Sequence, residues 1–257
     1  MIRVGVLGAN GRMGRTVSRA VADDPDLQLV AGVDTTGEGS ALEGADGVAV
    51  AAAPDALIEA RAQVAVDFTH PDAVMGNIRW AIEHGLHVVV GTTGVSPQDL
   101  EEIERLLKDQ GGRSNVFVAP NFAIGAVLAE RFAAQAARYF PAVEVIELHH
   151  DQKADAPSGT AMAAARRVAA ERAGPYRGPD RETLPGARGG DLDGVRVHSV
   201  RLPGLVAHQE IILGGPGQVL TIRHDSMDRS SFMPGVLLAI KEVAGRPGLT
   251  VGLDSLL

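Results

Sequence analysis

The N-terminal segment constrains the fold of this chain more than any other part of the sequence. Residues 3–7 are mostly apolar and lead directly into the turn Gly8-Ala9-Asn10-Gly11-Arg12-Met13-Gly14. Residues 13–22 then carry apolar side chains at helical spacing. A strand, a glycine turn and a helix in this order begin a βαβ unit, and they turn backbone N–H groups and the positive end of the helix dipole toward an anion. This segment therefore predicts a binding site for the pyrophosphate of a nucleotide.

An acidic residue at the end of the second predicted strand supports that prediction. The strand covers residues 28–33, and Asp34 follows it, 20 residues after Gly14. An acid at this distance binds the adenosine ribose in nucleotide-binding βαβ units. The spacing G-x-x-G-x-x-G differs from the commoner G-x-G-x-x-G, so the glycines taken alone could form only a tight turn. The order of strand, turn, helix and acid favours nucleotide binding.

Composition excludes several classes of protein. The 257 residues are 45% hydrophobic and 22% charged, which is typical of a globular chain of one or two domains. The formal net charge of -8 provides no basic surface for a nucleic acid or an acidic membrane, so an anionic substrate needs a local basic pocket. The absence of cysteine excludes disulfides, thiolate metal sites and a cysteine nucleophile. With no signal peptide and no apolar run near ~20 residues, we expect a cytoplasmic protein without a membrane span.

The predicted elements divide the chain into two domains. Strands alternate with helices in the first part, as in a mostly parallel α/β sheet, and the strands are predicted at 3–7, 28–33, 64–68, 87–90 and 116–119. The helix predicted at 97–110 has the clearest start, with Ser96 as N-cap and Pro97 as its first residue. We expect a dinucleotide-binding domain over residues 1–122, completed by residues 231–257, which contain a last predicted helix at 232–243.

The second domain, expected over residues 123–230, has the pattern of an α+β fold. Its helices are predicted at 125–139 and 160–173, and its strands at 143–149, 196–201, 207–213 and 219–224. The turns between the last three strands suit antiparallel connections. Residues 174–194 are rich in Gly, Pro and Arg and are predicted to form a long excursion.

Two further loops follow predicted strands of the first domain. They are Gly91-Thr92-Thr93-Gly94 and Ala119-Pro120-Asn121-Phe122. Each loop taken singly is more often an ordinary turn. Because the carboxyl ends of parallel strands meet at one edge of the sheet, the two loops are expected to line the same ligand crevice.

The densest group of polar side chains precedes and begins the helix predicted at 160–173. His149, His150 and Lys153 lie close together in an otherwise acidic chain. The helix start at Gly159 and Thr160 offers backbone N–H groups and a hydroxyl to a carboxylate. The sequence therefore predicts an anion site here.

Other interpretations of this group are weaker. Adjacent residues at the end of a strand point to opposite faces, and no cysteine is available, so we predict no metal site. Ser158 occupies a helix N-cap position and lacks the G-x-S-x-G elbow of a nucleophilic serine. Without the neighbouring lysine, the two histidines would be ordinary solvated or hydrogen-bonded loop residues.

The chain closely resembles the dihydrodipicolinate reductase family over this group. The family signature E-x-H-H-x-x-K-x-D-A-P-S-G-T-A is present without a break from Glu147 to Ala161. The resemblance extends to residues 8–14, 66–69, 91–94, 119–122, 224–226 and 229–232, and so spans nearly the whole chain. The family implies a Rossmann-like N-terminal domain, a mixed-sheet domain that binds the substrate, and a homotetramer built through those sheets.

The resemblance also implies a reaction and a role for each matched residue. The reaction is the NAD(P)H-dependent reduction of 4-hydroxy-tetrahydrodipicolinate, a cyclic dicarboxylate, to tetrahydrodipicolinate with loss of water, on the route to diaminopimelate and lysine. His149 and Lys153 are the implied proton-handling pair, and His150, Gly159 and Thr160 the implied contacts to a substrate carboxylate. The implied cofactor contacts are Gly8, Ala9, Asn10, Gly11, Arg12, Met13, Asp34, Gly91, Thr92, Thr93, Ala119, Pro120, Asn121 and Phe122.

We expect NADH to be favoured over NADPH, because the charge of Asp34 would repel a 2′-phosphate and no Arg or Lys occurs between Asp34 and Ala60. Two other functions are compatible with the sequence. One is a reductase of another small imino or amino dicarboxylic acid, since a fold does not determine its substrate. The other is a nucleotide-sensing module without turnover, against which the intact His-His-x-x-Lys run argues.

Overall fold

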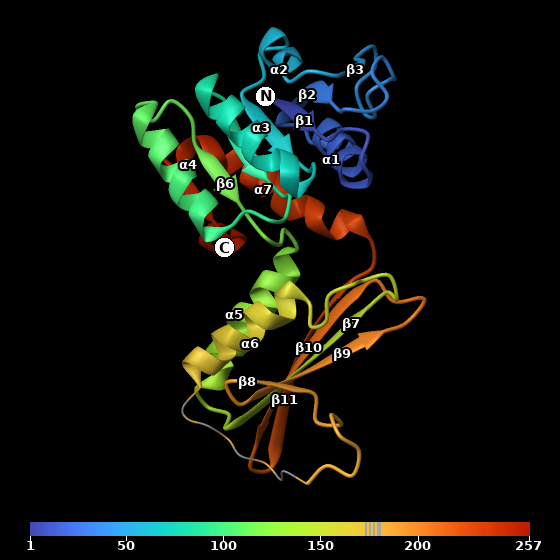
Figure 1. The fold of residues 1–257 in the computed structure, drawn as a ribbon, viewed down its shortest axis with the longest axis vertical. Coiled ribbons are helices and arrows are strands. Elements are labelled where there is room, and N and C mark those ends of the chain that lie inside the picture. The colour runs from blue at the N-terminus through green and yellow to red at the C-terminus, as the bar shows by residue number, and fades with distance from the viewer. Residues whose placement is uncertain (173, 175, 177, 179–180) are drawn as a thin grey trace. The chain divides into compact units, whose positions relative to one another are not determined.

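The chain folds into two compact units in the computed structural model, which describes residues 1–172, 174, 176, 178 and 181–257 (Figure 1). Unit 1 comprises Met1–Phe122 and Arg229–Leu257, and unit 2 comprises Ala123–Asp228. The residues outside the description fall at the end of the predicted helix 160–173 and within the predicted excursion 174–194. In the described part of the chain, no helix has the length and apolar character needed to cross a membrane.

Unit 1 is built on a seven-stranded sheet in the order β12-β6-β5-β4-β1-β2-β3, in which every pairing is parallel. The strands are β1 (Ile2–Leu7), β2 (Leu27–Val33), β3 (Val50–Ala51), β4 (Val64–Asp67), β5 (His87–Val90), β6 (Val116–Val118) and β12 (Leu249–Val251). The parallel α/β sheet predicted from the sequence is confirmed. Because β1 lies between β2 and β4, the strand order reverses beside β1, and ligands of such sheets bind at that reversal.

Helices cover both faces of this sheet, so its central strands are continuous buried runs (Figure 1). They are α1 (Arg12–Asp23), α2 (Asp55–Glu59), α3 (Pro71–Glu83), α4 (Pro97–Asp109) and α7 (Met233–Glu242). The predicted start of α4 is confirmed: the Ser96 hydroxyl accepts from the Asp99 backbone N–H at 3.2 Å, and the Asp99 carboxylate accepts from the Ser96 N–H at 2.8 Å. Short 3-10 turns at Arg229–Phe232, Val243–Gly245 and Leu253–Leu256 flank α7 and end the chain.

Unit 2 has a mixed five-stranded sheet in the order β11-β10-β7-β9-β8. Its strands are β7 (Ala142–His149), β8 (Gly190–Leu192), β9 (Val195–Arg201), β10 (Ala207–Gly215) and β11 (Gln218–Ser226). Two helices, α5 (Ile124–Ala137) and α6 (Gly159–Glu171), pack on one face through small residues such as Ala133, Ala164 and Ala165. Val145, Ile211 and Leu213 meet them from the sheet, and this apolar layer is the core of the unit.

Two expectations for unit 2 need correction. The predicted excursion 174–194 contains a strand, β8, whose three residues are too short to show an alternating pattern. The strands at 196–201 and 207–213 are not neighbours, because β7 lies between them and pairs parallel with β9. Turn residues specify a reversal of the chain but not which strand becomes the hydrogen-bonding partner. The antiparallel pairing of β10 with β11 is confirmed.

Candidate active site

The glycine turn after β1 has a geometry that only glycine allows at two positions. Gly8 has a φ of +79°, and a Cβ there would lie 2.5 Å from the Phe68 carbonyl oxygen. A Cβ on Gly14 would lie 1.9 Å from the carbonyl oxygen of Gly8. The first turn of α1 therefore packs directly against the backbone of the turn. This close packing forms the cradle that a nucleotide pyrophosphate requires.

Most N–H groups of the turn are used inside the protein. Those of Gly8 and Ala9 donate to the Val33 carbonyl at 2.8 and 3.1 Å, and that of Gly11 donates to Gly8 at 3.0 Å. Helix α1 has no side-chain cap and no acid in its first turn. In the part of the chain that the structure describes, the N–H groups of Arg12 and Met13 have no acceptor, so these two face an incoming anion.

Asp34 lies beside the turn and is held in place by several donors. Its carboxylate accepts from the backbone N–H of Asn10 at 2.9 Å and from the N–H and hydroxyl of Thr36 at 2.9 and 2.8 Å. Partial burial acts to raise the pKa of Asp34, but the hydrogen bonds from Thr36, Asn10 and Gly11 outweigh it and hold the pKa below its usual value. Asp34 is therefore an oriented carboxylate, as ribose binding requires.

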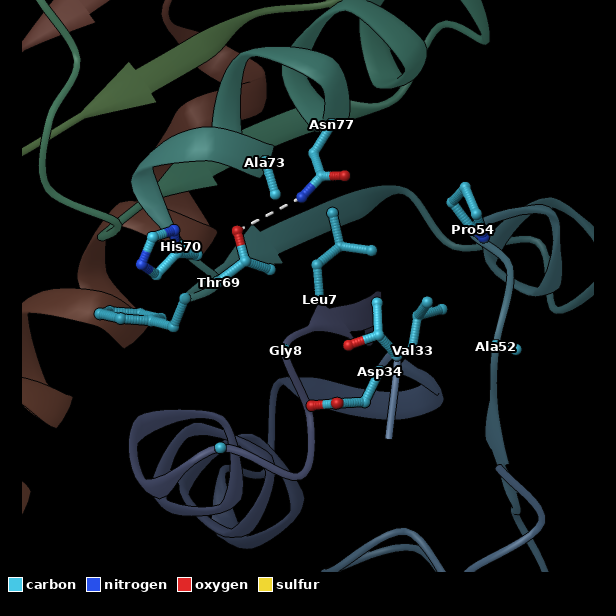
Figure 2. Close-up of a pocket in the computed structure, with 13 residues that line it drawn as sticks. Leu7, Gly8, Val33, Asp34, Ala52, Pro54, Thr69, His70, Ala73 and Asn77 are labelled. Carbon is cyan, nitrogen blue, oxygen red and sulfur yellow. Dashed lines mark hydrogen bonds between the residues drawn. The ribbon is translucent and has the colours of Figure 1, made fainter. Parts of the chain in front are cut away.

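A cavity of about 430 Å³ opens between these groups at the carboxyl ends of β1, β2 and β4 (Figure 2). Figure 2 shows Gly8 and Asp34 on one side of the cavity and Thr69, His70 and Asn77 on the other. Its size and lining fit part of a dinucleotide. No role was predicted for the loop 68–70, although it lies at the end of a predicted strand just as the loops 91–94 and 119–122 do.

A buried carboxylate connects two of these loops. Asp67 is fully buried and accepts from the hydroxyls of Thr69 and Thr92 at 2.7 and 2.6 Å and from the amide of Asn77 at 2.7 Å. The backbone N–H groups of Gly91 and Thr92 donate to the Asp67 carbonyl at 2.9 and 3.2 Å. Of the three residues predicted from this loop as cofactor contacts, Thr93 is the exposed one.

The other predicted loop is largely part of the core. Ala119 and Phe122 are 2% and 3% exposed, and the Phe122 ring packs 6.0 Å from that of Phe68. Pro120 is exposed and Asn121 is half-buried. A contact from this loop to a cofactor would therefore involve Pro120, Asn121 or the backbone and not the Phe122 ring.

In unit 2, the face of the sheet covered by α5 and α6 changes from apolar to polar along the strands. Across β10, β7 and β9, successive rows contain Ile211, Val145 and Val197, then Gln209, Glu147 and Ser199, then Ala207, His149 and Arg201. The start of α6 lies over this polar end, because the backbone N–H of Ser158 donates to Glu147 Oε1 at 3.2 Å. The Ser158 hydroxyl accepts from the Ala161 N–H at 3.2 Å, so its predicted capping role is confirmed.

Glu147 is the centre of this polar end. It is 0% exposed, and Arg201 donates to both of its oxygens at 2.8 Å. His149 Nδ1 forms a hydrogen bond with Glu147 Oε2. Burial alone would raise the pKa of Glu147, but the hydrogen bonds from Arg201, Ser199 and His149 hold it below its usual value. The sequence predicted no role for Arg201, because nothing in a strand sequence indicates which residue on a neighbouring strand will contact it.

The structure brings the predicted proton-handling residues to this end of unit 2. Burial lowers the pKa of His149, the Lys153 and Arg201 charges lower it further, and Glu147 opposes them without reversing the shift. Lys153 Nζ donates to Asp155 Oδ1 at 2.7 Å, and Arg201 Nη2 donates to the Asp155 carbonyl at 2.6 Å. The same loop therefore carries Lys153 and is attached to the Glu147 cluster.

The predicted carboxylate contacts lie on either side of that loop. His150 is exposed just after β7, and its carbonyl accepts from the Lys153 N–H at 3.2 Å. Gly159 and Thr160 are the first two residues of α6, where the helix dipole and backbone N–H groups favour an anion. The arrangement can therefore bind a carboxylate and place a proton donor close to it.

The chain is similar to known proteins over its full length. The family models described as the N-terminus and the C-terminus of dihydrodipicolinate reductase match residues 2–122 and 125–257. Proteins named 4-hydroxy-tetrahydrodipicolinate reductase are 56% identical in Nocardia farcinica and 52% identical in Mycolicibacterium smegmatis. The alignments cover all of this chain and 98% and 99% of those proteins. A solved structure of a dipicolinate-bound dihydrodipicolinate reductase from Paenisporosarcina sp. TG-14 is 42% identical, with a TM-score of 0.88 over the full length of both chains. The chain therefore belongs to the dihydrodipicolinate reductase family.

Proposed function

We propose that the chain reduces 4-hydroxy-tetrahydrodipicolinate to tetrahydrodipicolinate with loss of water, using a nicotinamide dinucleotide, in the synthesis of diaminopimelate and lysine. Relatives that match over the full length of the chain bear the name of this reductase. The observation that carries the proposal is the polar end of the unit 2 sheet, where His149, Lys153 and the start of α6 come together around Glu147. Unit 1 has the fold that binds the dinucleotide.

Unit 1 is proposed to hold the cofactor through its backbone and a few polar groups. The N–H groups of Arg12 and Met13 at the start of α1 would bind the pyrophosphate, and Asp34 would accept hydrogen bonds from the adenosine ribose. The loops 91–94 and 119–122 are proposed to complete the site. A bound, reduced nicotinamide supplies the hydride.

Unit 2 is proposed to hold the substrate and to supply the proton. Gly159 and Thr160 at the start of α6, with His150 and Lys153, would bind the ring carboxylates and orient the ring. Reduction of the conjugated imine leaves negative charge that an acid must neutralise. Because the pKa of His149 is lowered, its imidazole is mainly neutral near pH 7, and Lys153 is the better proton donor there.

One experiment separates this function from its alternatives. NADH absorbance is followed with freshly made product of dihydrodipicolinate synthase and with a panel of oxo and imino acids. We expect oxidation only with the synthase product. Faster oxidation with another imino or amino dicarboxylic acid would identify a different reductase. NADH binding with no oxidation by any substrate would identify a nucleotide-sensing module.

Dipicolinate is expected to compete with the substrate, because it offers two carboxylates to the same anchors. The solved relative from Paenisporosarcina is described as dipicolinate-bound. Thr160→Val removes a hydroxyl at the start of α6 and should raise the inhibition constant roughly tenfold, the scale of a lost hydrogen bond to a charged group. Thr250→Val on β12 of unit 1 is the control and should leave it unchanged. An unchanged constant in Thr160→Val would remove this residue from the anchor.

NADH is expected to be favoured over NADPH by roughly tenfold in kcat/KM, about 1–2 kcal/mol for a partly screened contact. Asp34 is ionised and lines the cavity next to Thr35, so a 2′-phosphate would meet its charge. Arg12 is the nearest cation in the glycine turn that could reduce the penalty. Thr35→Arg should shift the preference toward NADPH. The ratio of kcat/KM for the two cofactors at one ionic strength is the measurement, and a wild-type preference for NADPH would exclude Asp34 as the determinant.

The proposal includes a homotetramer in the cytoplasm, as the family resemblance implies. The sheet face of unit 2 opposite α5 and α6 would supply the subunit contacts. It carries apolar side chains such as Ile146 beside ion pairs such as Arg223–Glu210, a mixture suited to contact with a second copy. The mass of the purified protein by light scattering tests the assembly.

A further inference from the structure

Glu147 has no capacity left for a ligand. An ionised carboxylate offers about four acceptor positions. Ser158 and Arg201 donate to Oε1, Arg201 and His149 hydrogen-bond to Oε2, and Ser199 is a further hydrogen-bond partner of the carboxylate. With a side chain that is 0% exposed, Glu147 neither touches a substrate nor accepts a proton from one. Its charge must act on the residues that donate to it.

Those donors come from the segments that carry the proposed chemistry. His149 ends β7, Arg201 ends β9, and Ser158 is the N-cap of α6. The proposed proton-handling imidazole and the proposed carboxylate anchor therefore share one acceptor. Removing that acceptor would free the imidazole and the start of α6 to move independently of each other.

The hydrogen bond to Glu147 also determines how His149 presents its ring. Carboxylate oxygens only accept, so Nδ1 carries the proton and Nε2 is the remaining nitrogen. In the described part of the chain, no group hydrogen-bonds to Nε2. A neutral His149 therefore offers a lone pair at Nε2, and a protonated one offers an N–H at the same place.

The charges around His149 oppose each other. Glu147 on its own strand raises the pKa of His149, and Arg201 on β9 and Lys153 in the loop before α6 lower it. Asp155 in that loop is paired with Lys153. The residue facing His149 from β10 is Ala207, and the first turn of α6 carries no acid, so neither adds a charge.

We infer that Glu147 is a positioning residue, which holds the Nε2 of His149 and the N-terminus of α6 in one fixed geometry, with Arg201 as its counter-charge. The inference rests on the proposed function. It extends that function to a buried pair that touches neither substrate nor cofactor.

The test compares Glu147→Gln with Arg201→Gln by the pH dependence of kcat/KM, which reports the free enzyme. Glu147→Gln removes the anion that raises the pKa of His149. The limb of the kcat/KM profile that reports the titration of His149 should therefore move to lower pH. Arg201→Gln removes a cation that lowers it, so the limb should move to higher pH. Glu147→Gln should also lower kcat at least about tenfold, the usual cost of losing the partner that orients a functional histidine, and should weaken inhibition by dipicolinate.

Controls separate positioning from folding. Glu171→Gln removes the glutamate of an exposed Arg–Glu pair between α5 and α6 and should leave the profile unchanged. Circular dichroism and thermal unfolding check that unit 2, which contains all three substituted positions, is folded in each variant. Loss of folded protein scales the rate equally at every pH and cannot move two limbs in opposite directions. If Glu147→Gln yields no folded protein, Arg201→Gln alone decides the question by its upward shift.

If the wild-type enzyme is active but the pH profiles of the two variants are unshifted, or shift in the same direction, the inference is wrong. A wild-type protein that oxidises no NADH with the synthase product would instead remove the proposed function, and the inference with it.

Discussion

Lys153→Ala should lower turnover by at least ~100-fold and leave the affinity for NADH near that of the wild-type protein, because a positioned acid contributes ~100-fold or more. His149 cannot readily replace the lysine, since burial and the neighbouring cations keep the pKa of its imidazole low. Lys153 lies in unit 2, whereas Arg12, Met13 and Asp34, which we propose bind the cofactor, lie in unit 1. Steady-state kcat and NADH fluorescence titration measure the two quantities.

Lys153→Arg separates the role of Lys153 as a proton donor from its role as a positive charge. The guanidinium keeps a positive charge for the substrate carboxylate but is a very weak acid. Inhibition by dipicolinate should therefore be largely retained in this variant while turnover stays low. Lys108→Ala, an exposed lysine on α4, is the matched control and should behave as wild type. A Lys153→Ala enzyme that turns over at nearly the normal rate would exclude this residue as the acid.

Gly14→Ala should weaken NADH binding by roughly 100-fold. The new Cβ would lie 1.9 Å from the Gly8 carbonyl oxygen and 2.7 Å from its carbonyl carbon, and neither backbone atom can move without displacing the turn. Overpacking of this kind costs roughly 1–3 kcal/mol or more, and here the strain falls on the turn that we propose binds the pyrophosphate. Isothermal titration with NADH measures the affinity, and thermal unfolding measures the accompanying loss of stability.

Gly76→Ala in α3 is the control for that substitution. It is also a helical glycine of unit 1, but no heavy atom lies within 4 Å of the Cβ it would acquire. Because alanine is favoured over glycine by about 1 kcal/mol inside a helix, this variant should be as stable as wild type or more stable. If Gly14→Ala and Gly76→Ala bind NADH equally well, the close approach at Gly14 has no role in the site.

Much of the fold follows from local patterns. The buried apolar strands of unit 1 and the capped helix α4 are visible in the sequence, because burial on both faces and capping each require particular residues nearby in the chain. The strands β3, β8 and β12 are not visible, because two or three residues show no periodicity and, unlike the three residues of β6, these strands are not fully buried apolar runs. The place of β7 between β9 and β10 is not visible either, since it depends on pairing between distant segments.

The candidate site divides in the same way. The run that contains His149, Lys153 and Thr160 is contiguous, so its chemistry could be predicted residue by residue. Arg201 and Asp67 act through partners far away in the chain, and no local pattern indicates them. Predicted cofactor contacts such as Thr92 and Phe122 have side chains committed to Asp67 and to the core, and this depends on packing that a loop sequence does not reveal.

The sequence by itself therefore determined the family, the parallel α/β domain, the glycine turn and the polar run, because each depends on residues that are close together in the chain. Only the tertiary structure decided which groups are free to act. The N–H groups of Gly8 and Ala9 donate to the Val33 carbonyl, whereas those of Arg12 and Met13 have no acceptor among the residues that the structure describes. The Glu147 carboxylate is buried and hydrogen-bonded to Ser158 and Arg201, which are distant in the chain, as well as to His149. A hydrogen-bonding group can bind only a limited number of partners, and the fold determines which partners lie close enough to bind it.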